Sequence, residues 1–122
     1  MNEYKVIIAG GRHFNDYELL KEKCEYYLQN KLRESKVVII SGHATGADDL
    51  GERYAQERGL YLDAHPADWD KNGRAAGPIR NKEMAEIADA LIAFWDGASR
   101  GTKNMIDTAK SKGLKVAIVR YE

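Results

Sequence analysis

Four short, continuously apolar runs constrain what this chain can fold into more than any other feature of its sequence. They occupy residues 6–9, 37–40, 90–94 and 116–119, and amphipathic stretches separate them. The runs lack the alternation of apolar and polar residues that marks a sheet with one face in water. They are therefore predicted to be strands of a parallel sheet that is buried on both faces. A weaker fifth strand is predicted at 60–65, where alternation indicates an edge position.

The stretches between these runs predict four helices, because their apolar residues recur at three- and four-residue spacing. The residues that carry this spacing are Leu20, Cys24, Tyr27 and Leu28, then Leu50, Tyr54 and Ala55, then Met84, Ile87 and Ala88, then Met105, Ile106 and Ala109. Asp16 and Pro78 stand at predicted helix starts, and Gly59 and Gly113 at predicted ends. Alternating strands and helices predict an α/β fold: one domain over residues 1–122, with three Rossmann-like layers and a five-stranded, mainly parallel sheet that has helices on both faces.

Composition narrows the class of partner. The 122 residues include 19 basic and 19 acidic side chains, so the formal net charge is zero. A balanced charge removes the general attraction to phosphate backbones, which disfavours a nucleic-acid partner and favours a small ligand. The single cysteine, Cys24, and the lack of a charged and apolar leader before the first strand predict a cytoplasmic protein. The apolar runs are far shorter than the roughly 20 residues of a membrane span, so none is predicted.

Four loops follow the carboxyl ends of the predicted strands, at 10–14, 41–48, 66–77 and 96–102. In a parallel sheet these ends meet at one edge, where a ligand crevice lies. Three of the loops are rich in glycine and lead directly into helices, so backbone N–H groups and positive helix ends would face an anion. Each loop alone is explained by turn geometry and helix capping. Their convergence predicts a phosphate-binding edge.

Specific residues of these loops form the predicted ligand site. Its backbone amides are those of Gly10, Gly11, Gly42, Gly46 and Gly101 and the helix start at Thr102, with Ser41, Asn81 and Gly97 as further contacts. Arg12 and Arg80 would add positive charge, and Asp48 would contact ribose or cap its helix. The loop at 41–48 lacks the Gly-Lys-Ser/Thr ending of a Walker loop, so hydrolysis of the Walker type is not predicted.

The loop at 66–77 is longer than a connection needs. Trp69 is suited to stacking on a base, with Lys71, Arg74 and Arg80 supplying charge to phosphates. It is equally suited to packing the loop down while the basic residues face water, and the sequence favours neither.

Three histidines, His13, His43 and His65, fall near the same edge. Their spacing matches no ligand motif, so no metal site is predicted.

Four motifs in order resemble the SLOG superfamily, a Rossmann-like group that includes the lonely-guy phosphoribohydrolases and the DNA-processing protein A family. They are residues 10–14 with Asp16, residues 41–48, residues 66–69, and residues 77–81 with Met84. They look like a small stand-alone branch, and the resemblance covers nearly the whole chain. It implies a nucleotide-related ligand at the loop edge and, for some relatives, a homodimer.

The lonely-guy enzymes cleave an N-glycosidic bond with an arginine at a helix start and a glutamate after a Gly-Gly-x-Gly-Thr loop. Arg80 matches that arginine, whereas Met105 stands where the glutamate would be. Asp107 comes two positions later and would point about 200° around the helix. The resemblance therefore supports the class of ligand more than the reaction, and whether the chain is an enzyme is left open.

Three hypotheses follow. The first is binding or sensing of a nucleotide or a nucleotide-derived ligand such as ADP-ribose, with no other cofactor firmly implied. The second is phosphoribohydrolase-like cleavage of a nucleoside monophosphate, with Arg80 and a carboxylate from Asp48 or Asp96 as catalytic groups. The third is binding of single-stranded DNA.

Overall fold

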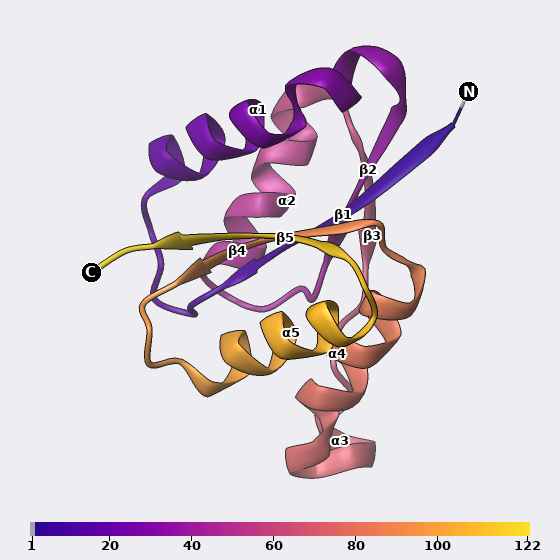
Figure 1. Ribbon diagram of the computed structural model, residues 1–122. Helices are drawn as coiled ribbons and strands as arrows, with labels where there is room; N and C mark the ends of the chain where they lie inside the picture. The colour runs from indigo at the N-terminus through magenta and orange to yellow at the C-terminus, as the bar shows by residue number, and fades with distance from the viewer. Residues whose placement is uncertain (1) are drawn as a thin grey trace.

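The computed structural model describes residues 2–122 (Figure 1). Its strands are β1 (Glu3–Gly10), β2 (Lys36–Ser41), β3 (Tyr61–Ala64), β4 (Ala90–Trp95) and β5 (Lys115–Arg120). Its helices are α1 (Tyr17–Glu34), α2 (Ala47–Arg58), α3 (Trp69–Asn72), α4 (Ala76–Ile87) and α5 (Arg100–Ser111), with a 3-10 turn, η1, at Gly73–Ala75.

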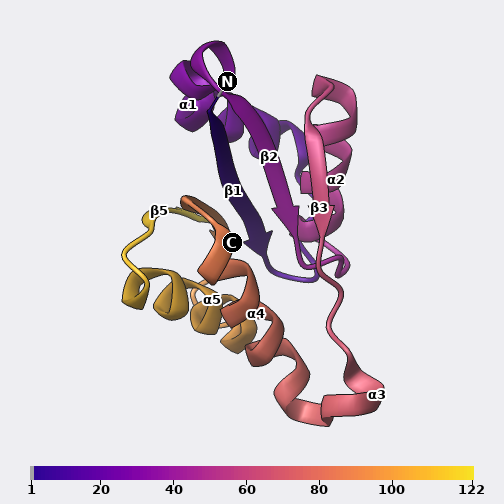
Figure 2. The same ribbon diagram turned by 90° about the vertical axis from the view of Figure 1, so that its right-hand side faces the viewer.

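The strands form one sheet in the order β3-β2-β1-β4-β5, and each pair of neighbouring strands runs parallel. Helices α1 and α2 cover one face of the sheet, and α4 and α5 cover the other (Figures 1 and 2). This arrangement confirms the predicted α/β fold, with three Rossmann-like layers and a five-stranded parallel sheet.

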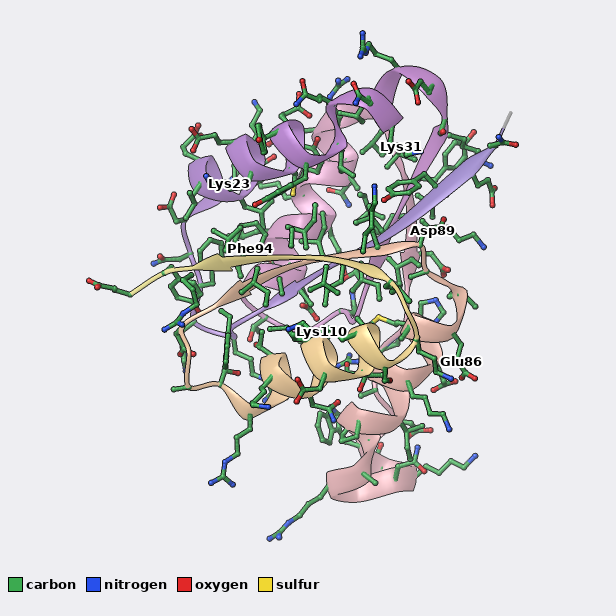
Figure 3. All side chains as sticks on the ribbon, in the orientation of Figure 1. Lys23, Lys31, Glu86, Asp89, Phe94 and Lys110 are labelled. Carbon is green, nitrogen blue, oxygen red and sulfur yellow. The ribbon has the colours of Figure 1, made fainter. Side chains whose placement is uncertain are left out.

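The central strands are buried on both faces, as the apolar runs predict. Val6 and Ile8 of β1 belong to an apolar cluster with α1 and α2, whereas Ile7 belongs to a second cluster with α4 and α5. All three side chains are 0% exposed. Figure 3 shows side chains filling the space between the sheet and the helices on each side. Two apolar layers therefore hold the sheet in place. The loops at the carboxyl ends of its strands remain available for binding a ligand.

The two edge strands differ from the central ones. Strand β3 lies at one edge, as its alternation predicts. Strand β5 lies at the other edge, and only Val119 among its residues is buried. The prediction that residues 116–119 are buried on both faces is therefore wrong, because β5 has a neighbouring strand on one side only.

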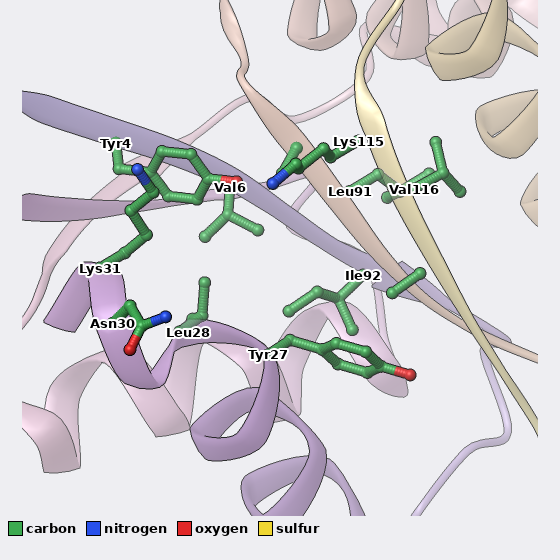
Figure 4. A pocket seen from close by; sticks show the side chains of 12 residues that line it. Tyr4, Val6, Tyr27, Leu28, Asn30, Lys31, Leu91, Ile92, Lys115 and Val116 are labelled. Carbon is green, nitrogen blue, oxygen red and sulfur yellow. The ribbon is translucent and has the colours of Figure 1, made fainter.

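A groove of about 330 Å³ explains part of this exposure. It lies between α1 and the halves of β1, β4 and β5 that are remote from the loop edge, and Figure 4 shows Tyr4, Leu28 and Ile92 around it. Lys31 and Lys115 also line it. No residue of the predicted ligand site lies in this groove.

The long connection after β3 contains structure that periodicity does not reveal. Asp68 caps the short helix α3 by accepting a hydrogen bond from the amide of Lys71 at 3.1 Å. Helix α4 then begins at Ala76, so Pro78 lies within its first turn instead of opening it. The chain therefore has five α-helices among residues 2–122, not four.

Two predicted helix boundaries are confirmed. Asp16 caps α1 through a hydrogen bond from the amide of Leu19 at 3.0 Å. Gly59 ends α2 in the left-handed conformation, at φ +72°. Of the helices in residues 2–122, none is long and apolar enough to cross a membrane.

Candidate functional site

The loops after β1, β2 and β4 meet at the carboxyl edge of the sheet. The amide of Gly11 donates to the carbonyl oxygen of Phe94 at 3.1 Å, and the amide of Ala47 donates to the carbonyl oxygen of Gly11 at 3.1 Å. The loop after β1 is thus held between the other two. Strand β1 also lies between β2 and β4, which the chain reaches through helices on opposite faces. In open parallel sheets such a switch point is where a ligand crevice forms.

A cavity of about 470 Å³ lies at this switch point. We call it the edge cavity; its lining residues are Gly11, Arg12, His13, Asp96, Ala98, Ser99, Gly101 and Tyr121. Its volume falls within the range of about 300–1,000 Å³ that is usual for small-molecule sites. The edge cavity therefore combines an arginine, glycine backbone and the start of a twelve-residue helix, α5.

The start of α5 is organised by its own loop. The Asp96 carboxylate accepts hydrogen bonds from the amides of Ala98 and Ser99, both at 2.8 Å, and these bonds lower the pKa of Asp96. Ser99 Oγ accepts a bond from the amide of Thr102 at 3.5 Å. The amide of Thr102 thus has a partner already. Of the residues predicted from this loop, Gly101 and the alternative carboxylate Asp96 line the edge cavity.

Beside the edge cavity, Arg80 joins three separate segments of the chain. Its Nη1 donates to the carbonyl oxygens of Gly42 at 2.5 Å and His65 at 3.5 Å, and its Nε donates to Asn81 Oδ1 at 2.9 Å. Asn81 Nδ2 in turn donates to Asn104 Oδ1 at 2.9 Å. This polar chain connects the loop after β2 to the first turns of α5.

Asp48 is a buried carboxylate at the same place, with 6% of its surface exposed. A Cβ on Gly42 would lie 2.5 Å from Arg80 Nη1 and 2.8 Å from Asp48 Oδ2, so both charged groups lie against Gly42. Burial raises the pKa of Asp48 to about 6, against the lowering effects of a bond from the amide of Ala44 and the charges of Arg80 and Arg12. Burial also lowers the pKa of Arg80. We call these two groups, with Gly42, the Asp48–Arg80 cluster.

A third set of contacts involves Ser41, His43 and Glu52. Ser41 Oγ donates to Glu52 Oε2 at 2.7 Å and accepts from the amide of His43 at 3.0 Å. His43 Nδ1 lies 2.8 Å from the same Glu52 oxygen. Sequence reasoning missed Glu52, although it follows Asp48 by four residues and so shares a helix face with it.

Trp69 reaches toward the edge cavity from α3. Its ring lies 5.7 Å from the guanidinium carbon of Arg12, and 49% of the residue is exposed. A Cβ on Gly77 would meet the ring at 3.4 Å. The ring therefore packs on the start of α4 while keeping an accessible surface next to Arg12.

The position at which the lonely-guy enzymes have their glutamate lies in the apolar core of this protein. Met105 is 2% exposed and belongs to the cluster between the sheet and α4 and α5. Asp107, two residues later, is exposed and pairs with Lys103 at 2.7 Å. Helix α5 thus brings no carboxylate from these positions to the edge cavity.

Within residues 2–122, no group of three or more His, Cys, Asp or Glu side chains is arranged to hold a metal ion.

The predicted site residues separate into distinct places. Gly11, Arg12 and Gly101 line the edge cavity; Ser41, Gly42, Asp48, Arg80 and Asn81 lie in the polar groups beside it; Gly10 and Gly46 let loop backbones touch; Trp69 lies beside Arg12; Gly97 packs on Arg120; and Thr102 is buried in α5. The structure thus brings most of them to one edge, but not into one pocket.

Solved structures share this fold. DNA processing protein A from Streptococcus pneumoniae is 18% identical, with a TM-score of 0.74 over 99% of this chain, which spans about half (51%) of that protein. DNA processing protein A from Helicobacter pylori, whose report concerns its single-stranded DNA binding mode, is 17% identical, with a TM-score of 0.66 over 98% of this chain and 66% of the other. TM1055 is 17% identical, with a TM-score of 0.65 over 95% of this chain and 72% of its own.

Comparison of sequences shows more about this chain than the shared fold does. Gene 61 protein of Mycobacterium phage D29 is 33% identical over an alignment 120 residues long, and the match covers 92% of this chain and 93% of that protein. Residues 4–72, from β1 to the end of α3, match the family described as "YspA, cpYpsA-related SLOG family". The chain therefore belongs to the YspA, cpYpsA-related SLOG family, in agreement with the resemblance that its loop motifs carry.

Proposed function

We propose that this protein binds a nucleotide or a nucleotide-derived phosphorylated ligand in the edge cavity. The observation that carries the proposal is the position of a 470 Å³ cavity at the switch point of the sheet, lined by Arg12 and the start of α5. Phosphate groups suit such a place because helix N-termini and arginine both favour anions. Membership of a SLOG family and the shared fold support the same class of ligand.

The proposal matches parts of the ligand to parts of the site. A phosphate would lie among Gly11, Arg12 and Gly101, which line the edge cavity. The ribose would face the Asp48–Arg80 cluster, where a buried carboxylate can accept hydrogen bonds from hydroxyl groups. The accessible ring of Trp69 beside Arg12 offers a surface for the base.

Replacing Arg12 with glutamine should weaken binding of AMP and ADP-ribose by about tenfold or more, because a charge-assisted hydrogen bond contributes about 1.5–3 kcal/mol. Thermal shift followed by calorimetric titration measures the change. A ligand at 100 times its Kd adds about 2.7 kcal/mol to the stability of the wild-type protein. Arg33→Gln is the control, since Arg33 lies on α1 with its guanidinium bonded to Asn30. Wild-type protein that binds neither compound would overturn the function, and equal binding by Arg12→Gln would overturn its placement.

A second function, cleavage of the N-glycosidic bond of a nucleoside monophosphate, is favoured by one observation. Asp48 is a buried carboxylate with a pKa of about 6, and it lies against the same glycine as Arg80. In this reaction a water oxygen bonds to the anomeric carbon while the carbon–nitrogen bond breaks. The water proton passes to the Asp48 carboxylate, and the base leaves with the bonding electrons and takes a proton from solvent. A carboxylate at this place also stabilises the positive charge that develops on the ribose.

Chromatography of the products from AMP tests this second function. Wild-type protein should release adenine, and Arg80→Ala should lower the rate by about a hundredfold or more, since a missing electrostatic contact of this kind costs about 10²–10³ in rate. Arg80 also holds loops together, so Asp48→Asn, which keeps the shape of the side chain, serves as the second inactive variant. Release of adenine by both variants at the wild-type rate would exclude this mechanism, while binding without release would leave the protein as a binding or sensing domain.

Single-stranded DNA is the third probe, because the report on the Helicobacter pylori relative concerns binding of such DNA. Binding through the backbone would weaken steeply with salt. The zero net charge leads us to expect weaker binding of an oligonucleotide than of the mononucleotide.

A further inference from the structure

His43 holds an unusual backbone conformation. Its φ is +59°, and it is the one non-glycine residue with positive φ among residues 2–122. Few residues other than glycine adopt this region, at a cost of about 1–2 kcal/mol; asparagine, aspartate and histidine adopt it more often than the others do. Such a conformation persists only where other contacts impose it, and it often marks a functional position.

Two neighbours impose the orientation of the His43 ring. Nδ1 lies 2.8 Å from Glu52 Oε2, and only 12% of the Glu52 side chain is exposed. Ser41, which is 0% exposed, donates to the same carboxylate oxygen and accepts from the amide of His43. The bond to Glu52 therefore fixes Nδ1 as a donor. Nε2 makes no hydrogen bond to any residue of the 2–122 range, and 59% of the side chain is exposed.

The charges around the ring favour its protonated form. The hydrogen bond and the charge of Glu52 raise the pKa of His43, and the charges of Asp49 and Asp48 on the same helix add to this effect. The Arg80 cation on α4 lies against Gly42, the residue before His43, and next to Asp48. A protonated His43 ring is therefore tolerated at this position, which directly follows Gly42 of the Asp48–Arg80 cluster.

We propose that His43 is a ligand-binding residue, whose Nε2–H donates to an anionic oxygen of the ligand that Arg12 and Arg80 also attract. The inference rests on the proposed function and adds a contact that depends on protonation. A Glu52-oriented imidazole with one free nitrogen is suited to this contact because its tautomer and direction are set before the ligand arrives. Binding then weakens as the imidazolium loses its proton with rising pH.

ADP-ribose is the probe for this inference. Each of its bridging phosphates keeps one charge throughout the range, whereas a phosphate monoester such as AMP gains charge near about pH 6. Calorimetric titration of the wild-type protein should give binding about tenfold tighter at about pH 5.5 than at about pH 8, the size of one charge-assisted contact. His43→Gln should lose most of this dependence and should bind like the wild type at the higher pH. Asp48 also titrates near pH 6, so it contributes to the pH dependence of binding as well. The Asp48→Asn variant removes that contribution and should keep the part of the pH dependence that is due to His43.

Two further variants separate contact from structure. Asparagine tolerates positive φ, so His43→Asn preserves the loop while removing the long reach of the imidazole. Glu52→Gln keeps the side-chain shape but removes the charge, so the pH at which binding weakens should move downward. These variants keep the test valid if glutamine at position 43 alters folding.

The outcomes of the test are distinct. If wild-type protein and His43→Gln both bind ADP-ribose with the same pH dependence, His43 makes no ligand contact and the proposed function stands. If His43→Gln and His43→Asn lower the melting temperature but leave the pH dependence unchanged, the Ser41, His43 and Glu52 contacts are structural and the inference is overturned. If no variant and no wild-type sample binds AMP or ADP-ribose at either pH, the proposed function itself fails.

Discussion

Replacing Asp48 with asparagine is expected to stabilise the protein by roughly 3 kcal/mol near neutral pH, because the folded state no longer has to bury a charged carboxylate. Burial raises the pKa of Asp48 from 3.8 to about 6. The folded state therefore binds the proton more tightly than the unfolded state does. The contribution of Asp48 to wild-type stability thus falls as the pH rises from about 4 to about 6 and is constant above that. At about pH 4 the gain from asparagine should shrink to less than about 1 kcal/mol.

Urea unfolding at the two pH values measures this difference. Asparagine keeps an oxygen that can accept the bond from the amide of Ala44, so the loop retains its contact. Asp49→Asn is the matched control: Asp49 is the next residue on α2 and is exposed, so its replacement should change stability by less than about 0.5 kcal/mol. A destabilised Asp48→Asn protein near neutral pH would show that the negative charge is held by attraction to Arg80 and Arg12 more strongly than burial opposes it.

This gain in stability should accompany a loss of function. A carboxylate that costs folding free energy persists where activity needs its charge. If Asp48→Asn were both more stable and fully able to bind AMP and ADP-ribose, the ribose contact assigned to Asp48 would be wrong.

Replacing Gly46 with alanine is expected to destabilise the protein by about 3 to 5 kcal/mol, because two separate costs add. Gly46 precedes α2 with φ +78° and ψ −127°, a region open almost only to glycine. A Cβ there would also collide with the carbonyl oxygen of Gly11 and lie 2.5 Å from the carbonyl carbon of Arg12. These are backbone atoms of the loop after β1, so no side-chain rotation relieves the clash.

Two other glycines separate the two costs. Gly59 has φ +72° and no atom within 4 Å of an added Cβ, so Gly59→Ala should cost about 1 kcal/mol, from conformation alone. Gly101 has neither positive φ nor a close neighbour and lies in α5, so Gly101→Ala should be neutral or slightly stabilising. Urea unfolding of the three variants measures the order. Equal losses for Gly46→Ala and Gly59→Ala would show that the loops after β1 and β2 can separate without cost.

Much of the fold follows from local patterns. The apolar runs at 6–9, 37–40 and 90–94 became buried strands because continuous hydrophobicity over a few residues has few other solutions in a chain of this kind. Residues 116–119 carry the same pattern, yet β5 is half-exposed because edge position depends on the other strands. Helix α3 was not predicted, because its four residues are too few to show the hydrophobic periodicity of a helix.

The location of the site was predictable from the sequence, but the contacts between its residues were not. Glycine-rich loops at the carboxyl ends of strands indicated the edge, and the edge cavity lies there. Nothing local joins Arg80 to Gly42, which are 38 residues apart, or shows that the start of α5 is joined to Asn81 through Asn104. Such contacts depend on how α4 and α5 pack on the far face of the sheet.

The α/β class, the layers and the edge at which the loops gather follow from the amino-acid sequence, because hydrophobic periodicity and strand direction are properties of short segments. The burial of Asp48 against the same glycine as Arg80, and the orientation of His43 by Glu52, arise when the chain packs in three dimensions. Burial and the approach of charges set the pKa of each group, and both depend on residues far away along the chain.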